Sequence, residues 1–152
     1  MPEMQFIIDI PADLDKVWAF HNTIDSLFIL TPPEKHAKLI GEGTPMCKGA
    51  VYKIQVKQFN FIPIQLWSEI IEYSPLEGFK DSQVKGHGPF KSWVHSHQFA
   101  AISPNVTRIT DTVQYELPMG VIGKLVNRIF VARDIKNMFR YRHQMTMNKL
   151  GA

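Results

Sequence analysis

Hydrophobic and polar positions alternate along much of the chain between residues 35 and 117. A period of two is typical of half-buried β-strands, and clusters of glycine, proline and other turn residues separate the alternating runs. The clearest run is Gly49–Phe59, in which Tyr52, Ile54 and Val56 alternate with lysine and glutamine. Together with a first strand over Gln5–Ile10, the pattern predicts strands over Lys35–Gly41, Gly49–Phe59, Phe61–Tyr73, Phe79–Lys85, Phe90–Ile102 and Thr107–Leu117.

Two short helices are expected after the first strand. Asp13 can cap a helix over Leu14–His21, because an aspartate side chain accepts hydrogen bonds from the free N–H groups of a first turn. A second helix can start at Thr23 or Asp25 and continue to Ile29, since the prolines that follow disfavour helical backbone.

The C-terminal region has the pattern of one long helix. From Val121 to about Lys149 it contains no proline and a single glycine, so a helix of up to roughly 28 residues can form. An apolar stripe at helical spacing indicates the face that packs on the rest of the protein. We expect this stripe to contain Val131, Ile135, Met138, Tyr141 or Arg142, and Met145.

The order of these elements is that of a helix-grip fold: a strand, two short helices, a run of about six strands and one long helix. Strands joined by hairpins form an antiparallel sheet, and the sheet must bury one face. The long helix is the only predicted element that can cover it. We therefore expect an α+β fold in which a curved antiparallel sheet of about six to seven strands wraps around the C-terminal helix.

The composition is that of a folded protein with a substantial core. Of the 152 residues, 45% are hydrophobic and 20% are charged, which excludes disorder. A chain of this length forms one domain, so residues 1–152 are expected to fold as a single unit. Ten phenylalanines supply the bulk that a large core or an apolar pocket needs.

Basic residues are concentrated in the predicted long helix. The net charge is only +3 and no nucleic-acid-binding motif is present, so we expect no nucleic-acid partner. We interpret the basic residues of the helix as its solvated face, and a docking surface for a protein partner is the alternative. These residues are Lys124, Arg128, Arg133, Lys136, Arg140, Arg142 and Lys149.

Cysteine content and hydropathy indicate a cytoplasmic protein. Cys47 is the only cysteine, so neither an internal disulfide nor a cysteine-based zinc site can form. The N-terminal residues lack the basic and then apolar order of a signal peptide, and no apolar run approaches the ~18 residues of a membrane span. We therefore expect a reducing, cytoplasmic location without stable insertion into a membrane.

The predicted strand over Phe90–Ile102 carries the most distinctive side chains. Successive side chains of a strand point to opposite faces, so Trp93, His95, His97 and Phe99 share one face. Because exposing two large aromatic groups is unfavourable, we expect this face to be the concave, buried one. The same alternation on neighbouring strands adds Asp81, Gln83, Asp111 and Tyr115 to it.

Several roles are open for these polar groups. His95 and His97 can form structural cross-strand hydrogen bonds with Asp81, Asp111 or Gln83. They can instead orient a ligand or act in acid–base catalysis, because a neighbouring carboxylate tunes an imidazole near neutral pH. A His-x-His pair is also part of many zinc sites, but the pattern offers no third and fourth ligand, so we expect no metal and no cofactor.

Other histidine and tryptophan residues are interpreted structurally. His21, at the end of the first predicted helix, is expected to be a cation that interacts favourably with the helix dipole. Trp18 and Trp67 are expected to lie in the core. The glycines around Glu42 and His87 lack the spacing of a phosphate-binding loop and are expected to mark turns.

Together, these segments resemble the START-like, or SRPBCC, superfamily, which includes polyketide cyclase/dehydrase-like and major birch-pollen-allergen-like proteins. The resemblance covers nearly the whole chain and is greatest to small bacterial members of unassigned function. The Trp-x-His-x-His-x-Phe strand is its most specific part. The matching segments are Pro11–His21, Leu30–Pro33, Phe79–Gln83, Gly88–Phe99 and Tyr115–Gly120.

The resemblance implies a curved sheet that grips the long helix, with an apolar cavity between them. It implies no single activity, since members bind lipids, sterols, polyketides or hormones and some catalyse cyclisation. We carry over no catalytic residue, because the catalytic residues of the cyclases vary between subfamilies.

We predict that the chain binds, without catalysis, a small hydrophobic or amphipathic ligand of lipid, polyketide or aromatic type in this cavity. One alternative is a cyclase- or dehydratase-type enzyme for a polyketide-like substrate, with His95 or His97 as the base and Asp111 or Asp81 orienting it. A partner-binding domain is a further alternative. The predicted ligand-binding residues are Trp93, His95, His97, Phe99, Asp81, Gln83, Asp111, Tyr115, Met138 and Met145.

Overall fold

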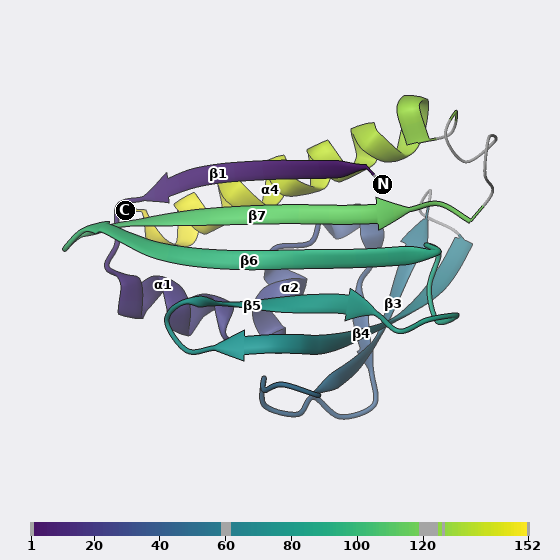
Figure 1. Cartoon of the computed structure of the whole chain (residues 1–152), viewed down its shortest axis with the longest axis horizontal. Helices are drawn as coiled ribbons and strands as arrows, with labels where there is room; N and C mark the ends of the chain where they lie inside the picture. The colour runs from purple at the N-terminus through teal and green to yellow at the C-terminus, as the bar shows by residue number, and fades with distance from the viewer. Residues whose placement is uncertain (1, 59–61, 119–124, 126, 152) are drawn as a thin grey trace.

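The computed structural model describes residues 2–58, 62–118, 125 and 127–151. Its strands form one antiparallel sheet in the order β1-β7-β6-β5-β4-β3-β2, so that β1 pairs with β7 (Figure 1). This arrangement confirms the expected α+β, helix-grip fold. The strands are β1 (Glu3–Ile10), β2 (Lys38–Ile40), β3 (Val51–Gln58), β4 (Ile62–Ser74), β5 (Gly78–Gln83), β6 (Ser92–Ser103) and β7 (Val106–Glu116).

Strand β2 differs most from its prediction. The alternation predicts a strand over Lys35–Gly41, but β2 has only three residues. A short 3-10 turn, η1 (Pro33–Lys35), occupies the start of the predicted segment, because proline at its first position already has a helical φ angle. Residues 59–61, at the predicted boundary between β3 and β4, lie outside the described residues.

Helices α1 (Leu14–His21) and α2 (Ile24–Ile29) lie on the same side of the sheet as the C-terminal helix (Figure 1). Helix α1 begins where its cap predicts, since Asp13 Oδ1 accepts a hydrogen bond of 2.8 Å from the Lys16 N–H. Thr23 caps α2 in the same way. Both caps fix where the chain turns away from β1 and toward the concave face.

The C-terminal helix, α4 (Ala132–Leu150), lies beside β1 and follows a π-helical turn, η2 (Asn127–Val131) (Figure 1). The predicted start at Val121 lies outside the described residues. The buried face of α4 partly corrects the predicted stripe. Its buried side chains are Ile135, Phe139, Arg142, Thr146 and Leu150, whereas Met138 and Met145 are half-buried.

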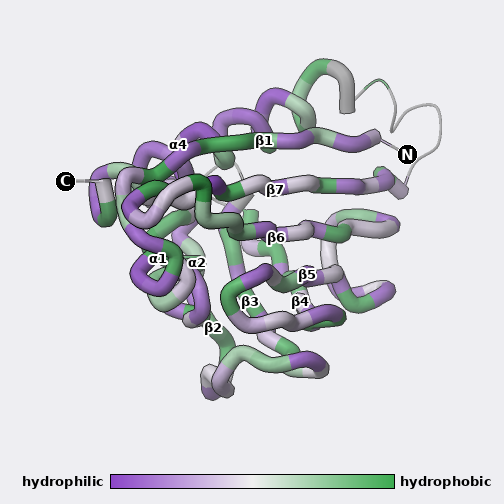
Figure 2. The backbone as a smooth tube through the Cα atoms, turned by 60° about the vertical axis from the view of Figure 1, so that its left-hand side comes forward, coloured by the Kyte–Doolittle hydropathy of each residue, from purple (hydrophilic) through white to green (hydrophobic). Residues whose placement is uncertain are grey.

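Two hydrophobic clusters form the core, one beside α1 and one under α4. In the first, Trp18 contacts the rings of Phe79 and Phe99 edge-on. In the second, Phe139 stacks on Phe6 with ring centroids 4.5 Å apart and planes 6° apart. Figure 2 shows hydrophobic and hydrophilic positions alternating along the strands, as one buried face requires. Among the described residues, no helix is both long and apolar enough to cross a membrane.

Candidate functional site

A cavity of about 240 Å³ lies between helix α4, helix α2 and the inner face of strands β3 to β6. This volume is just below the roughly 300–1,000 Å³ of sites that hold drug-sized ligands, so it suits a compact molecule. Most of its wall is apolar and comes from several elements. Among the lining residues are Leu27 of α2, Ile54 and Val56 of β3, Leu66 and Ile70 of β4, and Met138 of α4.

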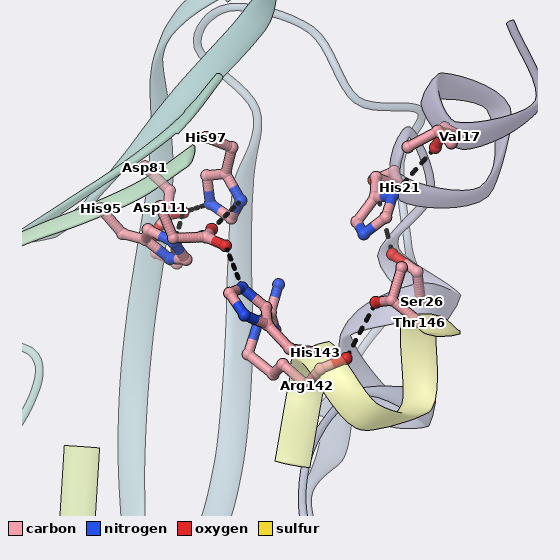
Figure 3. A network of polar contacts seen from close by, with 11 residues as sticks. Val17, His21, Ser26, Asp81, His95, His97, Asp111, Arg142, His143 and Thr146 are labelled. Carbon is pink, nitrogen blue, oxygen red and sulfur yellow. Dashed lines mark hydrogen bonds and ion pairs between the residues drawn. The ribbon is translucent and has the colours of Figure 1, made fainter. Parts of the chain in front are cut away.

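Four polar side chains form a hydrogen-bonded cluster at the wall of this cavity (Figure 3). His95 Nε2 lies 2.7 Å from Asp111 Oδ1, and His97 Nε2 lies 2.7 Å from Asp81 Oδ2. The other ring nitrogens face the opposite carboxylates at 3.8 Å for His95–Asp81 and 3.6 Å for His97–Asp111. The ring centroids are 3.6 Å apart. Each imidazole therefore lies between two carboxylates.

The register of three adjacent strands brings this cluster together. Asp81 on β5 is the cross-strand partner of His95 on β6, and Asp111 on β7 is the partner of His97. Side chains directly opposite each other on antiparallel strands are close enough to interact. The predicted face is confirmed, since His95 and His97 are each only 6% exposed.

Helix α4 contributes a third imidazole to the cluster. His143 Nε2 lies 3.1 Å from Asp111 Oδ2, while Oδ1 of the same carboxylate contacts His95 (Figure 3). Asp111 thus bridges the sheet and the helix.

Burial and hydrogen bonding set the charges of the cluster. Burial lowers the pKa of His97 to about 4, and the neighbouring His95 acts in the same direction. Burial alone would raise the pKa of a carboxyl group, but a hydrogen bond from His97 and the electrostatic effect of His95 keep the pKa of Asp81 below its usual value. Hydrogen bonds from His143 and His95 hold the pKa of Asp111 well below its usual value. At neutral pH, His97 is therefore neutral and both aspartates are charged.

A buried guanidinium group also faces the cavity. Arg142 on α4 is 9% exposed and lines the cavity, and its Cζ lies 5.7 Å from the centroid of the Phe139 ring. Burial lowers its pKa, and the nearby charges of Asp111 and Asp81 oppose this shift. This position corrects the interpretation of Arg142 as part of a solvated basic face. The helical spacing of three from Phe139 turns Arg142 inward.

His21 is also buried, which overturns its expected role. Burial lowers the pKa of His21 to about 4, and its Nδ1–H donates to the Val17 carbonyl at 2.9 Å. A ring that is neutral at pH 7 cannot act as a cation at the helix end. Trp18 lies in the core as expected. Trp67 does not, since it is half-buried and stacks on His87 with ring centroids 3.8 Å apart.

The predicted ligand-binding residues fall into two groups. Five of them line the cavity: Asp81, Trp93, His95, His97 and Met138. The other five are not among its lining residues. Of these, Asp111 is hydrogen-bonded to His95 and His143, and Gln83 is hydrogen-bonded to a neighbouring turn. Phe99 packs against Trp18, and Tyr115 belongs to the hydrophobic cluster under α4. Met145 is half-buried on α4.

The Gln83 contacts identify a structural role for that side chain. Its amide N–H donates to the Phe90 carbonyl at 2.6 Å, and its Oε1 accepts from the Phe90 N–H at 3.1 Å. A Cβ atom added at Gly88 would lie 2.1 Å from Gln83 Oε1, so the turn approaches the amide closely. Gln83 therefore fastens the turn before β6 to the end of β5.

Several cavity residues were not predicted from the sequence. Arg142 of α4 is one of them, and its spacing from the buried Ile135 and Phe139 is the signal that could have indicated it. His143, which joins the polar cluster from α4, was not predicted either, but it is not among the residues that line the cavity. Lys35 and Asp134 also line the cavity, and they form an ion pair of 2.9 Å between η1 and α4. These two residues are 99 positions apart, so no local pattern could have paired them.

The same cluster has part of the chemistry of a metal site. Ligand atoms of Asp81, His95 and His97 all lie within 4.8 Å of one another. Tetrahedral zinc takes four ligands, or three and a water in catalytic sites. In this structure, however, the Nε2 atom of each ring is hydrogen-bonded to a carboxylate. The arrangement as it stands is suited to orienting a polar group or exchanging a proton with it.

No protein-family model matches the sequence, and no curated protein matches it either. Solved structures do match. The match with a protein of Chromobacterium violaceum covers 100% of this chain and 99% of that protein's chain, with a TM-score of 0.76 and 12% identity. The match with Ara h 8.0201 covers 97% of this chain and 98% of the other, with a TM-score of 0.65 and 13% identity.

Norcoclaurine synthase of Thalictrum flavum, in complex with dopamine and hydroxybenzaldehyde, is also similar. The match covers 97% of this chain and 87% of the synthase chain, with a TM-score of 0.67 and 12% identity. At such identities the similarity concerns the fold alone. The chain has the helix-grip fold of START-like, Bet v 1-like proteins, as the sequence resemblance predicts.

Proposed function

We propose that the protein binds a small, largely apolar molecule in the cavity between the sheet and helix α4. The observation that carries this proposal is the composition of the cavity wall, which is mostly apolar and includes a cluster of polar groups. Sites that hold small molecules combine apolar walls with a small number of placed polar groups in this way. Among the polar side chains that line the cavity are His95, His97, Asp81 and Arg142.

In this proposal the apolar and polar residues have separate roles. Trp93 and Met138 contact the body of the ligand, and methionine suits an irregular ligand surface because its side chain is flexible. His95, His97 and Asp81 fix the orientation of the polar end. Asp111 positions His95 without lining the cavity itself.

A neutral, environment-sensitive dye, N-phenyl-1-naphthylamine, tests the proposal. The folded protein should bind the dye with increased fluorescence, and the dye should raise the melting temperature. At a hundred times the dissociation constant, binding adds roughly 2.7 kcal/mol to the free energy of unfolding.

Leu66→Trp fills the cavity and should abolish dye binding, since Leu66 lines it. Gln65→Trp is the matched control, because Gln65 is the exposed neighbour on β4 and places the same side chain on the opposite face. Thermal unfolding followed by circular dichroism shows that both variants are folded. Equal dye binding by the two variants would place the dye elsewhere and contradict the proposal.

One observation supports a second candidate function, acid–base catalysis. Each of the two histidines in the wall is hydrogen-bonded to an aspartate, which is the arrangement of an oriented general base. The substrate would then be an apolar ketone of polyketide or aromatic type. The test is exchange of the α-protons of acetophenone in D2O, followed by NMR. Exchange at the rate of buffer alone would exclude this function. A rate in both His95→Gln and His97→Gln equal to that of the wild-type protein would exclude it as well.

A further inference from the structure

We propose that the ligand is an amphipathic acid and that Arg142 binds its anionic group inside the cavity. The inference rests on the proposed function, because it names the chemical class of the molecule that occupies the cavity. It depends on three observations: the burial of Arg142, the lack of an ion pair between its guanidinium and any carboxylate of the described residues, and the apolar residues that line much of the cavity.

Arg142 is held in the wall by the helix rather than by an ion pair. Its side chain extends from α4 toward the aspartate–histidine cluster (Figure 3). Among the residues that the structure describes, no carboxylate forms an ion pair with the guanidinium and no side chain or backbone group hydrogen-bonds it. A buried guanidinium without such a partner is unfavourable, because it has lost hydration without gaining a counter-charge at contact distance.

The nearby carboxylates are already hydrogen-bonded to other groups. Both oxygens of Asp111 accept hydrogen bonds, one from His95 and one from His143. Asp81 Oδ2 accepts from His97, and Oδ1 lies 3.5 Å from Ser68 Oγ. Asp81 and Asp111 therefore act on Arg142 only through their charge at longer range. The N–H groups of Arg142 remain for a molecule in the cavity.

The chemistry of a guanidinium group selects the partner. Its planar fork of N–H groups matches the two oxygens of a carboxylate, and such charge-assisted pairs are stronger than neutral hydrogen bonds. The rest of the cavity is lined by residues such as Ile54, Leu66 and Met138, which suit an aliphatic or aromatic body. A volume of about 240 Å³ limits that body to a compact one, such as a medium-chain or aryl-substituted acid.

Competition against N-phenyl-1-naphthylamine tests the inference with three probes of one chain length: octanoate, octanol and octylamine. We expect octanoate to bind at least about tenfold more tightly than octanol, as one charge-assisted pair provides. Arg142→Met should remove this preference while octanol still binds. This variant should fold, because replacing a buried charge with an apolar side chain of similar length is tolerated.

Arg140→Met is the matched control, since Arg140 is an exposed arginine two positions earlier on α4. It should leave the affinity for all three probes unchanged. Arg142→Lys keeps the charge but not the planar fork, so it should retain part of the octanoate preference. It also serves as the second variant if Arg142→Met does not fold.

The outcomes separate this inference from the proposed function. If the dye and octanol bind but octanoate binds no more tightly, the cavity function stands and the role of Arg142 is refuted. Tighter binding of octylamine would also refute it, in favour of the aspartates as the recognition groups. If neither the dye nor any of the three probes binds, the proposed function itself fails.

Discussion

The two histidines with strongly lowered pKa values, His21 and His97, make the protein sensitive to acid. In the unfolded chain each imidazole takes up a proton near its ordinary pKa of 6.5, but in the folded protein each does so only near pH 4. Between these values the unfolded state binds more protons than the folded state, so stability rises with pH. The contribution of the two rings is fully present above pH 6.5 and is lost as the pH falls toward 4.

We therefore expect the free energy of unfolding to fall by about 2 kcal/mol per imidazole between pH 6.5 and pH 5. Urea unfolding at a series of pH values measures this. His97→Gln should reduce the slope of the free energy of unfolding against pH, because one of the two titrating rings is removed. His36→Asn is the control, since His36 is exposed and asparagine tolerates its positive φ angle of 47°. A slope that is the same in His97→Gln and wild type would contradict the pKa shift.

At the scale of the element, two adjacent residues of α4 that both line the cavity differ in how much they contribute to stability. Phe139 is fully buried and stacks on Phe6, so Phe139→Ala should lower the free energy of unfolding by about 3–5 kcal/mol. Met138 is half-buried and lines the cavity. Met138→Ala should lower stability by only about 1 kcal/mol while weakening dye binding.

Lys136 provides the control for this helix, because it is exposed on the opposite face. Lys136→Ala should change the free energy of unfolding by less than about 0.5 kcal/mol. Chemical denaturation and dye titration of the three variants check the expectation. Equal losses of stability at all three positions would mean that α4 does not pack through the Phe139 face.

The elements were largely predictable because their signals are local. Helix α1 begins after Asp13 since the capping carboxylate and the first turn are neighbours in sequence. A single strand places alternate side chains on one face, so the shared face of Trp93, His95, His97 and Phe99 could be predicted from the sequence. The burial of alternate positions along β6 confirms it. The order of the elements was also sufficient to predict the helix-grip arrangement.

What could not be predicted depends on contacts between distant segments. His21 is neutral because it is buried, and its ring packs against Phe99 of β6, which is far from it in sequence. The sequence left Tyr141 and Arg142 as alternatives for one position of the buried stripe, because the charge of Arg142 favours solvent, and only packing shows that Arg142 turns inward. Strand alternation places Gln83 on the same face as Asp81, as predicted. Its amide is hydrogen-bonded to the turn that follows β5, however, and does not line the cavity.

At the scale of the whole molecule, an ion pair at the cavity links the η1 turn to the covering helix α4. The Nζ of Lys35 lies 2.9 Å from Asp134 Oδ2, and the two side chains are 16% and 48% exposed. Such a partly exposed pair contributes little to stability, about 0–1 kcal/mol. Because both residues line the cavity, we expect the pair to slow the exit of a molecule bound there.

We expect Lys35→Met to speed the release of N-phenyl-1-naphthylamine while the free energy of unfolding changes by less than about 1 kcal/mol. Stopped-flow displacement of the dye measures the dissociation rate. Lys38→Met is the control, because Lys38 is an exposed lysine on the adjacent strand β2. Unchanged dissociation in Lys35→Met would show that this pair does not restrain the ligand.

The pairing of β1 with β7 also has a consequence for biosynthesis. Asp9 and Arg108, which form a salt bridge across these strands, are 99 residues apart. As the nascent chain leaves the ribosome, β1 emerges first and has no partner until nearly all of the sheet has been translated. Pairing of such distant segments is slow, and an unpaired strand can associate with other chains. The sheet is therefore completed late, and β1 must stay out of contact with neighbouring nascent chains until then.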